Sequence, residues 1–232
     1  EDQTSKWSIR TEHSHGEARD HRQTRNKGDS QTHSGTIALM DAAHVASALL
    51  QARAEGHCLD AADWPMPDDL AYVVQEHMTQ YRLDRRERII GWKLGYTSEA
   101  MRVQMGISTP NFGPLTDAML LYPGRLLPPA LQPKVEPEIA LVLDVAVDAP
   151  LDAVQCREAV RSAHVALEIV DSIWCGYRFT WAQNTADGSS AAYVVVGDEI
   201  DRDALSDMHV ELEINDKAAG VGAGHAAMGD PY

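Results

Sequence analysis

Three glutamates in two apolar segments have the residue type and spacing of a metal site. Glu136 and Glu138 stand two residues apart at the start of the apolar run 135–143, and Glu168 lies inside a second apolar run, 165–170. In an extended chain the side chains at i and i+2 lie on one face, so Glu136 and Glu138 can point into one space. Like charges held together need a proton or a cation between them. Three such carboxylates favour a hard divalent cation, Mg²⁺ or Mn²⁺, completed by water or substrate oxygens.

The same residues also have a purely structural interpretation. A Glu-x-Glu pair at the end of a strand is common on solvated sheet edges, and Glu168 could instead pair with an arginine or a lysine. Because structural ion pairs also gather carboxylates, the spacing alone leaves both a metal site and an ion-pair network open.

Two further segments carry groups that could contact a ligand. Lys93 lies between Gly91 and Gly95, and both glycines let the backbone approach another group closely. The lysine is either the ion-pair partner of a buried glutamate or a cationic contact for an anionic ligand. Small polar residues fill the segment 183–190, which is either an ordinary turn or a surround of backbone and hydroxyl groups for a ligand.

Hydrophobic periodicity and capping residues predict the elements that must position these groups. We expect helices over 37–56, 68–87, 98–105 and 152–163. We expect strands from residue 89 and over 119–122, 135–143, 165–170, 191–197 and 208–215, with loops over 109–117 and 174–181. Many short strands with few helices predict an α+β fold, in which a mixed β-sheet carries peripheral helices.

Composition excludes several classes of partner. The 232 residues include 35 acidic and 20 basic side chains, which gives a net charge of −15. A protein that binds nucleic acid or an anionic membrane surface needs a basic face, so we expect neither as a partner. No run of 18 apolar residues is present, so no membrane span is expected.

The N-terminal segment and the cysteines give two more expectations. Residues 1–35 are polar almost throughout, and we expect them to form a disordered tail. Cys58, Cys156 and Cys175 are odd in number and lack C-x-x-C spacing. This pattern predicts reduced thiols in a cytoplasmic protein rather than a disulfide framework or a zinc site.

Several short motifs together resemble the fumarylacetoacetate hydrolase superfamily. They are similar to the branch of 2-keto-4-pentenoate hydratases and 4-oxalocrotonate decarboxylases, and they follow one another in the order and spacing of that branch. The matching motifs are Gly-Trp-Lys-Leu-Gly-Tyr-Thr-Ser (91–98), Gln-Met-Gly-Ile (104–107), Pro-Asn-Phe-Gly (110–113), Val-Glu-Pro-Glu-Ile-Ala (135–140), Leu-Glu-Ile-Val-Asp-Ser (167–172), Ala-Asp with a serine two residues on (186–189), and the closing glycine-rich segment.

This resemblance implies a fold and a role for each candidate residue. The implied fold is a mixed β-sandwich roll over 89–232, with the metal at its open mouth and a helical segment, 36–88, before it. The implied metal ligands are Glu136, Glu138 and Glu168. The implied catalytic residues are Lys93, Glu138, Asp187 and Ser189, and the implied substrate contacts are Lys93, Asn111 and Ser189.

The resemblance also implies a reaction and its setting. A 2-oxo acid can chelate a divalent cation, which stabilises the enolate that develops at the 2-oxygen. The expected activity is that of a lyase on 2-hydroxy-2,4-dienoates or 2-oxo acids from the degradation of aromatic rings, by hydration or decarboxylation. The expected assembly is a cytoplasmic homo-oligomer, with or without a partner enzyme of the same pathway.

Three departures from the family pattern keep two alternatives open. Asn111 stands where hydratases commonly carry Asp, which favours decarboxylation because a candidate acid or base is lost. Gly188 replaces the usual Asn after Asp187, which could loosen that loop. The chain stops at Tyr232 where the family continues, so we expect an incomplete β-roll with exposed sheet edges. The alternatives are a hydrolase that cleaves acylpyruvate carbon–carbon bonds, for which His57 and His164 are available, and an inactive truncated partner subunit.

Overall fold

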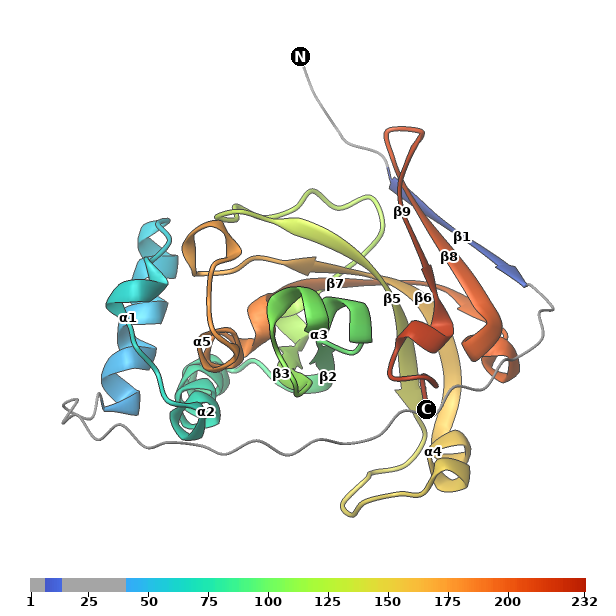
Figure 1. The fold of residues 1–232 in the computed structure, drawn as a ribbon, viewed down its shortest axis with the longest axis horizontal. Coiled ribbons are helices and arrows are strands. Elements are labelled where there is room, and N and C mark those ends of the chain that lie inside the picture. The colour runs from blue at the N-terminus through green and yellow to red at the C-terminus, as the bar shows by residue number, and fades with distance from the viewer. Residues whose placement is uncertain (1–6, 14–40) are drawn as a thin grey trace.

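A four-stranded mixed sheet forms the centre of the computed structural model, which describes residues 7–13 and 41–232 (Figure 1). Strands β5 and β6 are antiparallel, as are β6 and β7, whereas the short β4 runs parallel to β7. The predicted strands at 135–143, 165–170 and 191–197 are confirmed and extended. In sheet order the strands are β4 (Leu120–Leu121), β7 (Ala191–Ile200), β6 (Val160–Val170) and β5 (Lys134–Leu143).

A second sheet packs beside the first and supplies its core. Its order is β1 (Trp7–His13), β8 (Met208–Ile214) and β9 (Lys217–Ala223), all antiparallel. Buried residues of β8 and of the turn before it pack against apolar residues of β5 and β6, and this packing joins the sheets. The packed residues include Leu205, Met208, Val210, Ile139, Leu141 and Ala163.

Part of the segment expected to be a disordered tail is a strand. Trp7–His13 pairs with β8 over its whole length, from Trp7 opposite Ile214 to His13 opposite Met208. Backbone groups at a sheet edge bind a further strand through main-chain hydrogen bonds, and a polar sequence does not prevent this. The expectation of disorder is therefore wrong for residues 7–13, while 1–6 and 14–35 lie outside the described residues.

A β-hairpin with a helix in its connection carries Lys93. Strand β2 (Ile89–Gly95) pairs antiparallel with β3 (Asn111–Thr116), and helix α3 (Glu99–Met105) lies between them in the chain. Ser98 caps α3 through Met101 N, as predicted. The loop predicted at 109–117 is instead largely strand β3, because its polar and proline-containing sequence pairs with the neighbouring β2 backbone.

Three helices gather at the end of the molecule opposite the second sheet (Figure 1). They are α1 (Ala42–Glu55), α2 (Asp68–Asp84) and α5 (Trp181–Ala186). Helix α1 ends in a left-handed glycine, Gly56, and its apolar face packs on Ile173 and Trp174. Helices over 37–56 and 68–87 were expected. Within the described residues α1 begins at Ala42, and α2 agrees to within three residues.

One predicted helix boundary was wrong for a tertiary reason, and one open alternative is decided by the structure. Helix α4 (Ala153–Ala159) stops short of the predicted residue 163 because the chain from Val160 pairs with β5 instead. The polar segment 183–190 is not a simple turn, since it contains most of α5 and the 3₁₀ turn Gly188–Ser190. Further 3₁₀ turns are Ala61–Asp63, Asp117–Met119, Cys175–Tyr177, Arg202–Asp207 and Gly224–Ala226.

The expectation of three reduced thiols was also wrong. Cys58 and Cys175 form a disulfide with their Cα atoms 5.1 Å apart, which leaves Cys156 free. The two cysteines are 117 positions apart in sequence, so spacing gave no signal. They meet because Leu59 and Trp174 form an isolated β-bridge.

The architecture agrees with the expected α+β fold, in which a mixed sheet carries peripheral helices. In the described part of the chain, no helix is both long and apolar enough to cross a membrane.

A buried ion network fastens α1 to the central sheet. Arg53 pairs with Asp187 at 2.8 Å and with Asp171 at 3.2 Å, and it also donates to the Asp171 carbonyl at 3.0 Å. Asp187 also accepts from Ile173 N at 2.9 Å. Burial opposes the charge of Arg53, but the charge of Asp187, its hydrogen bond and the charge of Asp171 together raise the Arg53 pKa.

We expect Arg53→Met to destabilise the fold by about 3 kcal/mol or more, because it leaves two buried carboxylates without a counter-ion. Urea unfolding followed by circular dichroism measures this loss. Arg161→Met is the matched control: Arg161 pairs with Asp144 at 3.9 Å with both side chains 63% exposed, so its loss should stay within about 1 kcal/mol. Equal losses in the two variants would contradict a stabilising role for the Arg53 network.

Candidate metal centre

The pairing of β5 with β6 brings the three predicted carboxylates together. Glu136 lies directly opposite Glu168 in the antiparallel register, and Glu138 lies two residues along on the same face. One carboxylate oxygen from each residue lies within 4.8 Å of the others. The sequence expectation that these side chains share one space therefore agrees with the geometry.

Glu168 combines an ion pair with an unsatisfied oxygen. The residue is 4% exposed, and its Oε2 pairs with Lys93 Nζ at 3.0 Å. Its Oε1 is buried without a hydrogen-bond partner among the described residues. A buried carboxylate oxygen left in this way is costly unless another group binds it.

One lysine faces three carboxylates in this cluster. Desolvation and the charge of Glu168 raise the pKa of Glu138 to about 8, against the opposing effect of Lys93. Desolvation likewise raises the pKa of Glu168. For Lys93, burial favours the neutral form, but the charges of Glu168 and Glu136 outweigh it and raise the Lys93 pKa. The cluster thus holds more negative charge than Lys93 balances, and its hard oxygen donors fit a divalent cation.

Close glycine contacts place Lys93 over this cluster. Lys93 pairs with Gly113, and Gly95 pairs with Asn111, across the β2–β3 hairpin. A Cβ at Gly113 would overlap the Gly188 carbonyl, and one at Gly95 would overlap the Asn111 and Ser189 side chains. The hairpin can therefore lie against the 188–190 turn only with glycine at 113, and a side chain at 95 would displace Asn111 and Ser189. Lys93 Nζ also donates to the Ser189 carbonyl at 3.1 Å, so the alternative of an ion pair with a buried glutamate is realised.

Asn111 and Ser189 form a hydrogen-bonded pair beside the lysine. The Ser189 hydroxyl donates to Asn111 Oδ1 at 2.9 Å. Asn111 Nδ2 donates to Asn184 Oδ1 at 3.0 Å and to Thr185 Oγ1 at 2.9 Å. Both are buried, and Ser189 has a left-handed backbone with φ 57°. The polar segment 183–190 therefore acts as a rigid wall whose hydroxyl and amide groups are already oriented.

Asp187 was predicted to be catalytic, but its contacts are with residues outside the glutamate cluster. Its two carboxylate oxygens contact Arg53 and Ile173 N, so it braces the turn that carries Ser189. Arg53 could not be recognised from the sequence, because an arginine in the last turn of an amphipathic helix is typical of a solvated helix end. His164, one of the histidines considered for hydrolysis, contacts Ser162 and the Gly197 carbonyl, whereas His57 lies near Glu55 at the surface.

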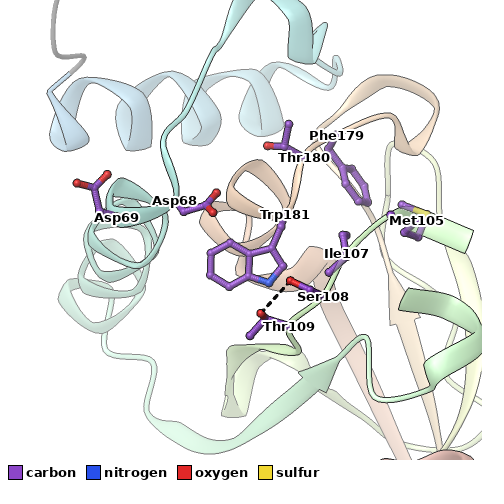
Figure 2. A pocket seen from close by; sticks show the side chains of 10 residues that line it. Asp68, Asp69, Met105, Ile107, Ser108, Thr109, Phe179, Thr180 and Trp181 are labelled. Atoms are coloured by element: carbon purple, nitrogen blue, oxygen red, sulfur yellow. Dashed lines mark hydrogen bonds between the residues drawn. The ribbon is translucent and has the colours of Figure 1, made fainter. Parts of the chain in front are cut away.

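A separate hollow of about 670 Å³ lies between α2, the segment after α3 and the start of α5 (Figure 2). Met105, Ile107, Phe179 and Trp181 line it, with Asp68 and Asp69 contributed by α2. None of the predicted site residues line it. Two carboxylates without a lysine or arginine in its wall make it a poor site for an acidic substrate.

Comparison with curated proteins finds relatives that are named hydratases and decarboxylases. The chain is 34% identical over 175 residues to a 2-hydroxypent-2,4-dienoate hydratase of Pseudomonas putida, covering 69% of this chain and 76% of the relative. It is 32% identical to a 2-keto-4-pentenoate hydratase of Burkholderia vietnamiensis, covering 82% and 76%. It is 30% identical to a 4-oxalocrotonate decarboxylase of a Pseudomonas species, covering 69% of this chain and 64% of that protein. No protein-family model matches the chain.

Solved structures agree with the sequence relatives. Two structures of 4-oxalocrotonate decarboxylase from Pseudomonas putida G7 are similar, each at 26% identity. The one complexed with magnesium and adipate has a TM-score of 0.75 and covers 82% of this chain and 76% of its own. The one complexed with calcium and acetate has a TM-score of 0.76, with coverage of 85% and 78%. Fold, motif order and sequence identity agree, and the chain belongs to the 2-keto-4-pentenoate hydratase and 4-oxalocrotonate decarboxylase branch of the fumarylacetoacetate hydrolase superfamily.

Proposed function

We propose that this protein is a divalent-metal-dependent lyase that acts on 2-hydroxy-2,4-dienoates or 2-oxo acids. The observation that carries the proposal is the cluster of Glu136, Glu138 and Glu168, three converging carboxylates balanced by one buried lysine. The names of the relatives, hydratase and decarboxylase, support the reaction class, and the magnesium and calcium of the solved neighbours support the cation.

In this proposal the three glutamates hold Mg²⁺ or Mn²⁺. Glu168 Oε1, buried and without a partner among the described residues, is suited to one ligand position. The bound cation would supply Lewis-acid stabilisation of negative charge at the 2-oxygen of the substrate. The chain's own groups then supply orientation, exclusion of water and proton transfer.

Lys93 is the proposed contact for the substrate carboxylate and the proposed proton relay. Its ammonium group is held by Glu168 and by the Ser189 carbonyl, and its side chain is 9% exposed. A cation fixed in this way can bind an anionic group without reorganising. Ser189 and Asn111 would line the substrate, and the Ser189 hydroxyl would donate to it by exchanging its hydrogen bond to Asn111 Oδ1. Asp187 would contribute indirectly, by holding the turn that carries Ser189.

Decarboxylation is the favoured reaction of the two. Asn111 cannot exchange a proton as an aspartate would, and both its donor and acceptor atoms are engaged by neighbours. The β2–β3 side of the site therefore lacks a carboxylic acid or base at this position. Loss of CO₂ needs mainly an electron sink, whereas hydration also needs a group that activates water.

The assembly and the location are proposed on the family resemblance. We propose a catalytic unit over 89–232 braced by the helical segment 36–88, in a homo-oligomer that can include a partner enzyme. Exposed Trp92, Leu94 and Phe112 on the β2–β3 hairpin support a subunit contact. A cytoplasmic location fits catabolic enzymes of this kind, although the Cys58–Cys175 disulfide is more typical of oxidising compartments.

Mg²⁺-dependent loss of ultraviolet absorbance, with 2-hydroxypenta-2,4-dienoate and 4-oxalocrotonate in parallel, tests the proposed activity. We expect turnover of one substrate, and a loss on the order of 10³-fold in Glu138→Gln because a metal ligand is removed. Glu158→Gln, at an exposed position of α4, is the matched control and should retain full activity. Metal binding without turnover of either substrate would contradict the lyase proposal and make acylpyruvate the next substrate to test.

Lys93→Ala should lower kcat by roughly 10²- to 10⁴-fold without weakening Mg²⁺ binding, because Lys93 is a cation that relays protons and is not a metal ligand. Steady-state kinetics and calorimetric metal titration measure the two effects separately. Lys217→Ala, at an exposed position of β9, is the control. An unchanged kcat in Lys93→Ala would refute the proposed role of the lysine.

Mg²⁺ affinity should rise with pH up to about 8, because the Glu138 pKa is raised to about 8 and its proton must leave before the metal binds. The slope should approach about tenfold per pH unit for one released proton between roughly pH 6 and 8. Calorimetry in buffers of different ionisation enthalpy counts that proton. The same slope in Glu138→Gln would show that another group is responsible.

A further inference from the structure

Tyr96 lies in a strained turn at the edge of the carboxylate site. It follows β2 and precedes α3, and its backbone is left-handed with φ 58°, a conformation that bulky residues rarely adopt. Arg102 Nη1 holds the turn by donating to the Tyr96 carbonyl at 2.7 Å and to the Thr97 carbonyl at 2.8 Å. Met228 N also donates to the Thr97 carbonyl at 3.1 Å. The surrounding structure therefore holds the backbone of this turn in its left-handed conformation.

The phenol of Tyr96 ends in an unsatisfied hydroxyl. Its oxygen is buried and has no hydrogen-bond partner among the described residues. A buried hydroxyl without a partner destabilises the folded protein unless a ligand or an ordered water completes it. In the described part of the chain only two other side-chain groups share this condition, Glu168 Oε1 and Trp181 Nε1. The first of these belongs to the candidate metal centre.

The residues next to Tyr96 in the chain contact the groups around the three glutamates. The preceding residue, Gly95, packs against the Asn111 and Ser189 side chains, and Lys93 lies three residues before Tyr96 in the chain. Burial and the negative charge of Glu136 both raise the pKa of Tyr96, so its hydroxyl keeps its proton and remains a donor. A buried phenol that keeps its proton and lacks an internal acceptor can donate to an oxygen of a bound molecule.

We propose that Tyr96 is a specificity-determining residue whose hydroxyl donates a hydrogen bond to the 2-oxo acid end of the bound substrate. The inference rests on the proposed function for the identity of the substrate, whereas the unsatisfied hydroxyl itself is a feature of the structure. The hydroxyl selects for an oxygen at this position, because a ligand without one leaves the donor buried and unpaired. A phenylalanine at this position would fill the same space without that selection.

Oxalate, an unreactive mimic of the 2-oxo acid end, is the probe. Its dissociation constant is measured by calorimetry at saturating Mg²⁺ for the wild type, for Tyr96→Phe and for Tyr122→Phe, which removes a hydroxyl from a side chain that is 69% exposed. We expect Tyr96→Phe to weaken oxalate binding about tenfold, as for loss of one hydrogen bond to a charged group, and Tyr122→Phe to change nothing. Oxalate affinity within twofold of the wild type in Tyr96→Phe would overturn the proposal.

Thermal unfolding without metal or ligand separates this contact from a structural role. The unliganded hydroxyl has no partner to lose, so Tyr96→Phe should leave Tm unchanged or raise it. A lower Tm would mean that the hydroxyl is bonded within the protein, which would also overturn the proposal.

Turnover of the two dienoate substrates distinguishes failure of this proposal from failure of the proposed function. If the wild type turns over neither substrate but oxalate binding still depends on Tyr96, the contact stands and the lyase assignment fails. If the wild type is active and Tyr96→Phe leaves both kcat/KM and oxalate affinity unchanged, the lyase assignment stands and the role of Tyr96 fails. No binding of oxalate to the metal-loaded wild type would overturn the contact.

Discussion

The register between β5 and β6 places Glu136 directly opposite Glu168. The charge repulsion between these two glutamates is the constraint that the rest of the site must offset. Like charges at opposed positions of an antiparallel pair destabilise it. Glu136 and Glu168 occupy such positions, and Glu138 lies two residues along on the same face, with Lys93 as the one lysine among them in the described part of the chain. Burial, together with the neighbouring carboxylate charges, raises the pKa values of Glu138 and Glu168. A divalent cation, as proposed, would remove this repulsion by replacing protons with a shared positive charge.

The position of Lys93 depends on residues that have no charge of their own. Gly95 and Gly113 let the β2–β3 hairpin lie against the turn at Gly188, and this contact brings the lysine to Glu168 and to the Ser189 carbonyl. Asn111 then links the hairpin to α5 through Asn184 and Thr185. The carboxylate face of the sheet and the polar wall beside it are thus held in one arrangement by backbone proximity and neutral hydrogen bonds.

A second ion network supports this arrangement from behind. Arg53 of α1 contacts Asp171, at the end of β6, and Asp187, before the Ser189 turn. The helices at this end of the molecule are therefore joined to both segments that reach the site. Removing a buried counter-ion costs more than an intact buried pair contributes, so such a network specifies one arrangement more than it adds stability. In this protein the arrangement it specifies is that of the 187–190 turn.

The sequence by itself determined the chemistry of the site, and the tertiary structure decided how that chemistry is supported. The two-residue spacing of Glu136 and Glu138 in an apolar run predicted one shared face, and the motifs around Lys93 and Glu168 predicted the family. These features are local, because strand period and motif order depend on neighbouring residues.

The sequence could not decide whether Lys93 pairs with a glutamate. It also could not show that residues 111–116 and 7–13 form strands, or that Cys58 meets Cys175 across 117 positions. Nor could it identify Arg53 as the partner of Asp187 or Tyr96 as the bearer of an unsatisfied hydroxyl. Each of these depends on contacts between segments far apart in the chain, and only the packed sheets and helices bring those segments together.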